Sequence, residues 1–328
     1  MAVKKLHNPI YLALILAAIL LGAFPADAAR VRPTKKITVE KPDFDKIARQ
    51  TLDPRNEFYF PKLMKLYNRN DTSMTQEQYR NLYLGYLFQE DYDPYRTSPY
   101  NAVSDSILQI VNEQKARLTT VTDSLNKLVK ANKISGHEAE KKKERISNTY
   151  KRTLRELATA VELSLKDNPF DLRQMSVLVH ASQEMGNAMK AKIWEYRLEN
   201  ILGAIKSTGS GDSMENAFYV IYPMHEYNII QLLGYEPVSV DFPSDGFDYI
   251  SVQPDADAKR KPARPVSGFY FNVGPLTEQY DLKHPEAGDS DPNSSGSTQH
   301  KITPDADDFP AADDDFTTIL SPDETPAE

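Results

Sequence analysis

His225 and Glu226 are adjacent, and they are the residues that a zinc-hydrolase helix uses for metal binding and general base catalysis. That chemistry needs a second His four residues after the first, because this spacing places both imidazoles on one helix face. The residue at that position is Ile229. We therefore expect His225 and Glu226 to have structural roles.

Ser210 lies between Gly209 and Gly211, which invites comparison with a serine nucleophile. A nucleophile elbow has the pattern G-x-S-x-G after a strand. Here the glycine spacing differs and the preceding segment has a helical pattern. A loop followed by a capped helix from about Met214 accounts better for these residues. The start of such a helix could also hold an anion, and this alternative stays open.

Templates for cofactors and metals do not match the sequence. There is no G-x-x-x-x-G-K phosphate loop, and no dinucleotide fingerprint follows a strand. A calcium-like segment starts at Asp289, but Ser294 and His300 stand where glycine and glutamate are needed. The absence of cysteine excludes disulfides, thiol catalysis and thiolate metal sites. We expect no cofactor and no specific metal site, with only weak calcium association at the acidic C-terminus as an alternative.

Tyrosines provide the best candidate for a binding surface. A tyrosine combines a large apolar ring with a polar hydroxyl, which suits interfaces and sugar stacking. The alternative is that those at helical spacing pack inside a layer of helices. The candidate interaction surface consists of Tyr79, Tyr83, Tyr86, Tyr92 and Tyr95.

Most of the chain has the hydrophobic periodicity of α-helices, and these helices must position the candidate residues. Pro61 is a favoured first-turn residue, and Thr75 with Gln78 forms a capping-box pattern before an apolar face. A further helix is expected from Met214 to Leu233, kinked or divided at Pro223.

Residues 104–165 form a long and strongly charged helical stretch. Asn132 to Gly136 has turn chemistry, so we expect two helices that form an antiparallel hairpin. The run Lys141–Arg145 is its most polar point. We interpret this run as a solvated face, with a basic contact site for an anionic surface as the alternative.

The next block resembles a tetratricopeptide repeat. Pro169 follows one helix, Gly186 separates the next two, and Ala191 lies five positions beyond that glycine. Small residues at such positions let paired helices approach closely. The resemblance covers about one and a half units, and it implies helix pairs without a complete solenoid.

After Gly234 the hydrophobic period changes from helix to strand. Residues 247–252 and 268–273 alternate and are rich in aromatic and β-branched side chains, which predicts two strands joined by a long loop. The sequence thus predicts a mainly α fold with tetratricopeptide-like helix pairs and a small C-terminal β-hairpin, in a single domain over residues 41–283.

The first 28 residues have the pattern of a secretory signal peptide. Lys4 and Lys5 precede an apolar run from Ile10 to Phe24, and Ala26-Asp27-Ala28 follows it. The run is shorter than the roughly 20 residues of a membrane-spanning helix. We expect cleavage after Ala28 and a mature protein without a transmembrane segment, located in the periplasm or outside the cell.

Two further segments differ from the expected domain in composition. Residues 29–40 are basic and polar, and we expect a flexible leader. Residues 284–328 are acidic and poor in apolar side chains, and we expect a disordered tail. The net charge of −8 disfavours nucleic acid as a partner, because binding to phosphates depends on Lys and Arg.

Four stretches together resemble a bacterial domain-of-unknown-function family of small exported proteins. They are residues 58–64, 79–86, 91–95 and 209–227. The resemblance runs from about Phe44 to Leu276 and skips much of the charged middle. It implies export and a mostly helical fold, and it implies no reaction, since the family has no assigned activity.

Two functional hypotheses follow. The preferred one is a non-catalytic interaction module of the cell envelope, with a protein or peptide partner bound by paired helices. The alternative is a hydrolase or glycan-active enzyme built on Asp91, Asp93 and Glu226. Paired carboxylates hydrolyse glycosidic bonds when the fold holds them about 5–10 Å apart.

Overall fold

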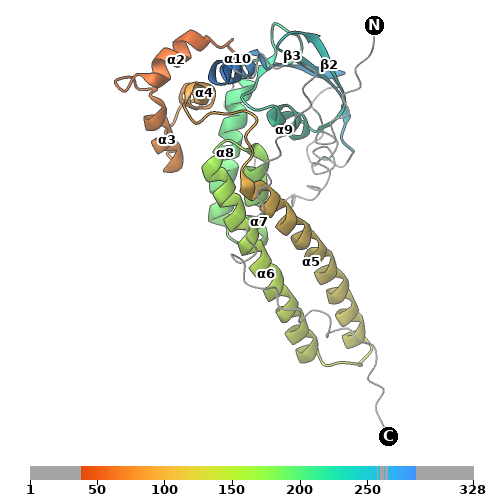
Figure 1. Cartoon of the computed structure of the whole chain (residues 1–328). Coiled ribbons are helices and arrows are strands. Elements are labelled where there is room, and N and C mark those ends of the chain that lie inside the picture. The colour runs from red at the N-terminus through yellow and green to blue at the C-terminus, as the bar shows by residue number, and fades with distance from the viewer. Residues whose placement is uncertain (1–37, 257, 259–261, 263–264, 286–328) are drawn as a thin grey trace. The chain divides into compact units, whose positions relative to one another are not determined.

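Three short helices form the first layer of the fold (Figure 1). The computed structural model describes residues 38–285 apart from 257, 259–261 and 263–264. The expected signal peptide, residues 29–37 of the expected leader, residues 286–328 of the expected tail and the calcium-like segment at Asp289 lie outside this range. The described residues up to His284 belong to one compact unit. The three helices are α2 (Phe44–Leu52), α3 (Phe60–Asn68) and α4 (Gln76–Gly85).

Local signals set the starts of these helices. The side chain of Asp43 accepts a hydrogen bond from the Lys46 backbone at the start of α2. Thr75 and Gln78 form both hydrogen bonds of a capping box at the start of α4, which confirms the prediction. A short 3₁₀ helix, η1 (Tyr86–Phe88), continues α4 toward a loop.

A long antiparallel hairpin follows, made of α5 (Pro99–Lys130) and α6 (Gly136–Asp167). Asn132 adopts a positive φ of 53°, and the Lys133 N–H donates to the Leu128 carbonyl at 3.0 Å. This left-handed cap ends α5, and the Ser135 side chain caps α6. The predicted hairpin is confirmed, with its turn where the sequence placed it.

The next two helices are α7 (Leu172–Glu184) and α8 (Ala188–Lys206). Packing runs from α6 to α7 to α8, and α8 returns to α4. Gly186 ends α7 with a φ of 75°, and Ala191 is buried in α8. The helix ends thus fall where Pro169 and Gly186 indicated. The likeness to a tetratricopeptide repeat stays a prediction.

The C-terminal part contains a four-stranded sheet rather than only a hairpin. Its order is β1-β4-β3-β2, with β1 parallel to β4 and the other pairs antiparallel. The two predicted strands form its centre, where Ile250 pairs with Phe269. The strands are β1 (Phe218–Tyr219), β2 (Tyr235–Ser244), β3 (Phe247–Pro254) and β4 (Gly268–Asn272).

Two short helices accompany the sheet, α9 (Met224–Leu232) and α10 (Gly274–Lys283). The single helix expected from Met214 to Leu233 is therefore wrong in its first half. Pro223 precedes α9 instead of interrupting a longer helix, a position where proline costs no hydrogen bond. Ile229 and Ile230 of α9 are buried, and α9 packs beside β2.

Candidate functional site

Four of the five tyrosines proposed as a surface lie in the core. Their exposed fractions are 2% for Tyr79, 0% for Tyr83, 2% for Tyr86 and 1% for Tyr92. Tyr95 is 52% exposed, and its ring packs edge-on against Tyr280 at 4.8 Å. Of these five tyrosines, only Tyr95 is exposed to a partner. The ring of Tyr79 packs against Tyr196 on α8, and the rings of Tyr83, Tyr86 and Tyr92 pack among Phe170, Tyr222 and His225.

The buried rings surround a hydrogen-bond chain that we call the Tyr83–His225 node. The Ile221 N–H donates to the Tyr83 hydroxyl at 3.1 Å, and that hydroxyl donates to Nδ1 of His225 at 2.7 Å. Nε2 of His225 donates to the Phe170 carbonyl at 2.9 Å. Since a carbonyl can only accept, these partners place the imidazole proton on Nε2. The Tyr92 hydroxyl completes the node by donating to the Ile221 carbonyl at 2.6 Å.

His225 is held neutral in this node. Its exposed fraction is 1%, and burial lowers its pKa to about 3, against a smaller opposite effect of the Phe170 carbonyl. Both ring nitrogens are occupied by internal partners. The node therefore joins α4, the loop after α6 and α9, which is a structural role of the kind that the sequence predicted.

Glu226 has an acidic neighbour that sequence reasoning missed. It is 3% exposed, and its carboxyl group is hydrogen-bonded to Asp248 on β3. Burial first, and then the nearby Asp248 carboxylate, raise the pKa of Glu226 well above its ordinary value. Burial also raises the pKa of Asp248. Glu226 therefore keeps its proton in the native state, and this proton forms the hydrogen bond to Asp248. The Oε1 atom of Glu226 has no hydrogen-bond partner among the described residues.

The other two carboxylates of the hydrolase hypothesis have different surroundings. The exposed Asp91 accepts a hydrogen bond from the Tyr86 hydroxyl at 3.3 Å. Asp93 accepts from the Tyr95 backbone N–H at 2.9 Å and so shapes a turn. The carboxylate that Glu226 meets is Asp248. The alternation of β3, which places Asp248 on the same sheet face as the buried Ile250, was the signal that could have revealed it.

The segment around Ser210 forms a turn. The backbone N–H groups of Ser210 and Gly211 both donate to the Asn216 carbonyl, at 2.9 and 2.8 Å. Gly211 has a φ of 72°, and no helix starts at Met214. The expectation of a capped helix there is therefore wrong, and with it goes the anion site that such a helix would have offered.

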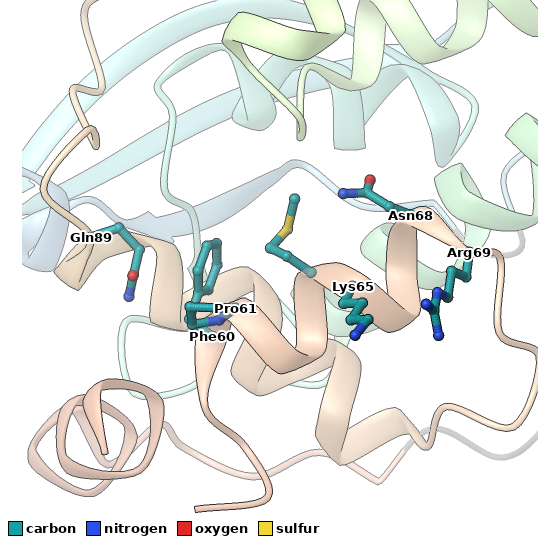
Figure 2. Close-up of a pocket in the computed structure, with 7 residues that line it drawn as sticks. Phe60, Pro61, Lys65, Asn68, Arg69 and Gln89 are labelled. Atoms are coloured by element: carbon teal, nitrogen blue, oxygen red, sulfur yellow. The ribbon is translucent and has the colours of Figure 1, made fainter. Parts of the chain in front are cut away.

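An open groove runs along α3 (Figure 2). Figure 2 shows Lys65 and Arg69 one turn apart on the same side of the helix, with Asn68 directed away from them. The lining of the groove combines apolar residues with two basic side chains. It consists of Phe60, Pro61, Met64, Lys65, Asn68, Arg69 and Gln89.

The α5–α6 hairpin extends past the helices that support it (Figure 1). Glu184 ends α7, and its carboxylate binds Lys115 on α5 and the Tyr150 hydroxyl on α6, each at 2.9 Å. From Lys115 to the end of α5 at Lys130 is fifteen residues, which is about 22 Å of helix at 1.5 Å per residue. The outer part of the hairpin therefore lies beyond the end of α7.

Within residues 38–285, apart from the stated gaps, no group of three or more His, Cys, Asp or Glu side chains is placed to hold a metal ion. The helices of the same part of the chain include none that is long and apolar enough to cross a membrane.

The fold is that of a mainly helical protein with a small C-terminal sheet. The hydrogen bonds of the Tyr83–His225 node connect elements of its core. The model of a family described as a domain of unknown function (DUF4919) matches residues 45–135 and 124–282. The chain belongs to this family. No curated protein and no solved structure matches the chain.

Proposed function

We propose that this protein is an exported, non-catalytic interaction module of the cell envelope that presents the α5–α6 hairpin to its partner. The observation that carries this proposal is the extension of the hairpin by about 22 Å beyond the Glu184 contacts. A pair of helices in this arrangement can reach a partner without rearrangement of the core.

The base of the hairpin is built to keep its direction. Asp105 of α5 pairs with Arg173 of α7. The Gln174 side chain donates to Asn101 at 3.2 Å and to Ser104 at 3.0 Å. Together with Glu184, these contacts join α5 and α7 at both ends of α7. Buried polar networks with several partners hold one arrangement of packed helices, which suits a projecting element that must be presented in a fixed orientation.

Export is the second part of the proposal, and the N-terminal sequence supports it. A charged start, an apolar run and Ala26-Asp27-Ala28 are the pattern that signal peptidase recognises. Cleavage after Ala28 gives a mature chain that begins at Ala29. N-terminal sequencing of the protein recovered from a periplasmic or extracellular fraction tests this, and an intact Met1 start in that fraction would contradict it.

The hairpin can be tested in the intact protein because the chain has no cysteine. Asn126→Cys, modified with a maleimide polyethylene glycol, masks the exposed hairpin. Met189→Cys, modified in the same way, masks an exposed site on α8 and is the control. We expect mature protein to co-sediment with isolated cell envelopes, and only the modification at position 126 to prevent it. Equal binding of both modified proteins, or no binding of the unmodified one, would overturn the proposal.

A second candidate function rests on the Glu226–Asp248 pair. Two carboxyl groups that share a proton resemble the acid–base pairs of glycan hydrolysis in chemistry. Hydrolysis of envelope glycans by the purified protein, abolished by Glu226→Gln and by Asp248→Asn, would support an enzyme. Activity that survives both substitutions would remove the pair from consideration.

A further inference from the structure

The outer hairpin has a charge opposite to that of the whole chain. Between Arg117 and Thr149, which lie beyond the Glu184 contacts, there are eight Lys or Arg residues and four Asp or Glu residues, an excess of four positive charges. The complete chain has a net charge of −8. Positive charge is thus concentrated on the part of the hairpin that lies beyond α7.

Some of these charges are neutralised within α6. Lys142 pairs with Glu138 at 3.0 Å, and Lys143 pairs with Glu140 at 3.4 Å. Four other lysines are exposed and have no acidic partner among the described residues. They are Lys127, Lys130, Lys133 and Lys141, which we call the tip lysines.

The tip lysines converge on the end of the hairpin. Lys127 and Lys130 lie in the last turn of α5, and Lys133 lies in the connecting turn. Lys141 is five residues into α6, which is about 8 Å along the axis at 1.5 Å per residue. The left-handed cap at Asn132 and the Ser135 cap fix this turn, so the four ammonium groups are presented by an ordered end.

An apolar side chain accompanies the lysines. Leu128 lies between Lys127 and Lys130 and is 36% exposed, and Ile134 of the turn is partly exposed. Basic side chains around a small apolar group match a membrane surface, where the cations meet anionic headgroups and the apolar group meets the acyl boundary. A soluble polyanion offers anionic groups for the lysines, but it has no apolar region for Leu128 and Ile134.

We propose that the tip of the hairpin docks onto a membrane surface rich in anionic phospholipid headgroups. This inference rests on the proposed function and names the partner of the hairpin. Four lysines near such a surface strengthen binding by about fivefold each, so together they account for roughly 100- to 1000-fold. Because the attraction is electrostatic and exposed, it weakens as salt shortens the Debye length.

Vesicle co-sedimentation of the mature protein tests the charge. Vesicles of phosphatidylglycerol mixed with phosphatidylcholine should bind the protein, and vesicles of phosphatidylcholine alone should not. Replacing the four tip lysines by Gln should lower the partition coefficient by roughly 100-fold or more. A matched variant removes the same charge from exposed positions of the body and should bind as the wild type does. Its substitutions are Lys41→Gln, Lys46→Gln, Lys65→Gln and Lys192→Gln.

A fluorescent label tests which part of the protein meets the bilayer. An environment-sensitive dye on Leu128→Cys should shift its emission to the blue when anionic vesicles are added. The same dye on Met189→Cys, which is 70% exposed on α8, should not change. Binding of DNA or heparin as tight as that of vesicles, without a shift at position 128, would show a general polyanion site and overturn the membrane assignment.

The outcomes separate the two proposals. Binding to isolated envelopes that masking at position 126 prevents, together with no binding to anionic vesicles, would overturn the membrane inference and leave the interaction module standing. Binding to neither would overturn both. Equal loss of vesicle binding in the tip and body variants would show an effect of net charge and would also overturn the tip as the docking site.

Discussion

The Tyr83–His225 node and the hairpin tip use polar chemistry in opposite ways. In the node, the Tyr83 hydroxyl and both nitrogens of His225 find partners inside the protein, and burial keeps the imidazole neutral. At the tip, exposed lysines have no acidic partner within the described part of the chain. The residues most suggestive of catalysis pack inside the fold, whereas those most typical of a solvated surface form the contact that we propose for a partner.

The largest expected effect comes from removing the centre of the node. His225→Ala leaves the Tyr83 hydroxyl and the Phe170 carbonyl without their partner and creates a buried cavity. We expect a loss of about 3–5 kcal/mol in the free energy of unfolding. Urea denaturation followed by circular dichroism measures it. His137→Ala, the same change at the exposed tip, should cost less than about 0.5 kcal/mol. Similar losses in both variants would break the comparison.

The second expected effect is acid sensitivity from His225. In the native state the pKa is about 3, and in the unfolded state it is near the ordinary 6.5. Below pH 6.5 the unfolded state therefore binds a proton that the native state excludes, so His225 lowers stability as the pH falls from 6.5 toward 3. The slope from this group reaches about 1.4 kcal/mol per pH unit.

Urea midpoints measured across this pH range test the effect. His225→Asn cannot titrate there, so its stability should change less with pH than that of the wild type. Carboxylates contribute equally to both proteins and cancel in the difference. Parallel pH profiles for the two proteins would show that His225 is protonated in the native state, contrary to the node as described.

The third expected effect has the opposite pH dependence. The raised pKa of Glu226 means that the native state keeps a proton that the unfolded state releases above about pH 4.5. The contribution of Glu226 to the free energy of unfolding therefore falls as the pH rises above about 4.5. Glu226→Gln retains the shape and a donor to Asp248 without a titrating group. We expect a gain on the order of 1 kcal/mol at neutral pH that disappears near pH 4.

Thermal unfolding of the wild type and Glu226→Gln at neutral and acidic pH measures this gain. Glu236→Gln on β2, where the carboxylate is exposed, is the matched control and should have no pH-dependent effect. A loss of stability at neutral pH in Glu226→Gln would show that Glu226 is ionised in the native state. That result would also count against the second candidate function, which needs the two carboxyl groups to share a proton.

Helices and their ends could be predicted because their signals are local. The capping box of Thr75 and the turn from Asn132 to Gly136 depend on neighbours within a few residues. The first half of the helix expected from Met214 instead consists of turns and the two-residue strand β1, because distant groups hold it. Phe218 pairs with Phe271, and the Tyr219 N–H donates to Thr208. The hydrophobic periodicity of a segment reflects only its near neighbours, so it could not reveal this long-range pairing.

The strand β2 and the acid pair were missed for related reasons. The segment of β2 contains Pro237 and Pro243, which are unfavourable within a sheet, although prolines are tolerated on an edge strand with irregular register. Glu226 and Asp248 lie 22 positions apart, on a helix and a strand that only the sheet topology brings together. The burial of the tyrosines, in contrast, was the alternative that their helical spacing had offered.

The smallest expected effect concerns the stability of the tip itself. Lys127 and Lys130 lie in the last turn of α5, where cations stabilise the helix dipole by about 0.3–1 kcal/mol each when exposed charges are weakly screened. Their removal also relieves repulsion among the tip lysines, which offsets part of that loss. Replacement of all four by Gln should therefore change the free energy of unfolding by less than about 1 kcal/mol, as urea denaturation can determine. The body variant with four matched substitutions sets the baseline. A large destabilisation confined to the tip variant would mean that these lysines serve the fold, as His225 does, and the contrast between node and tip would be lost.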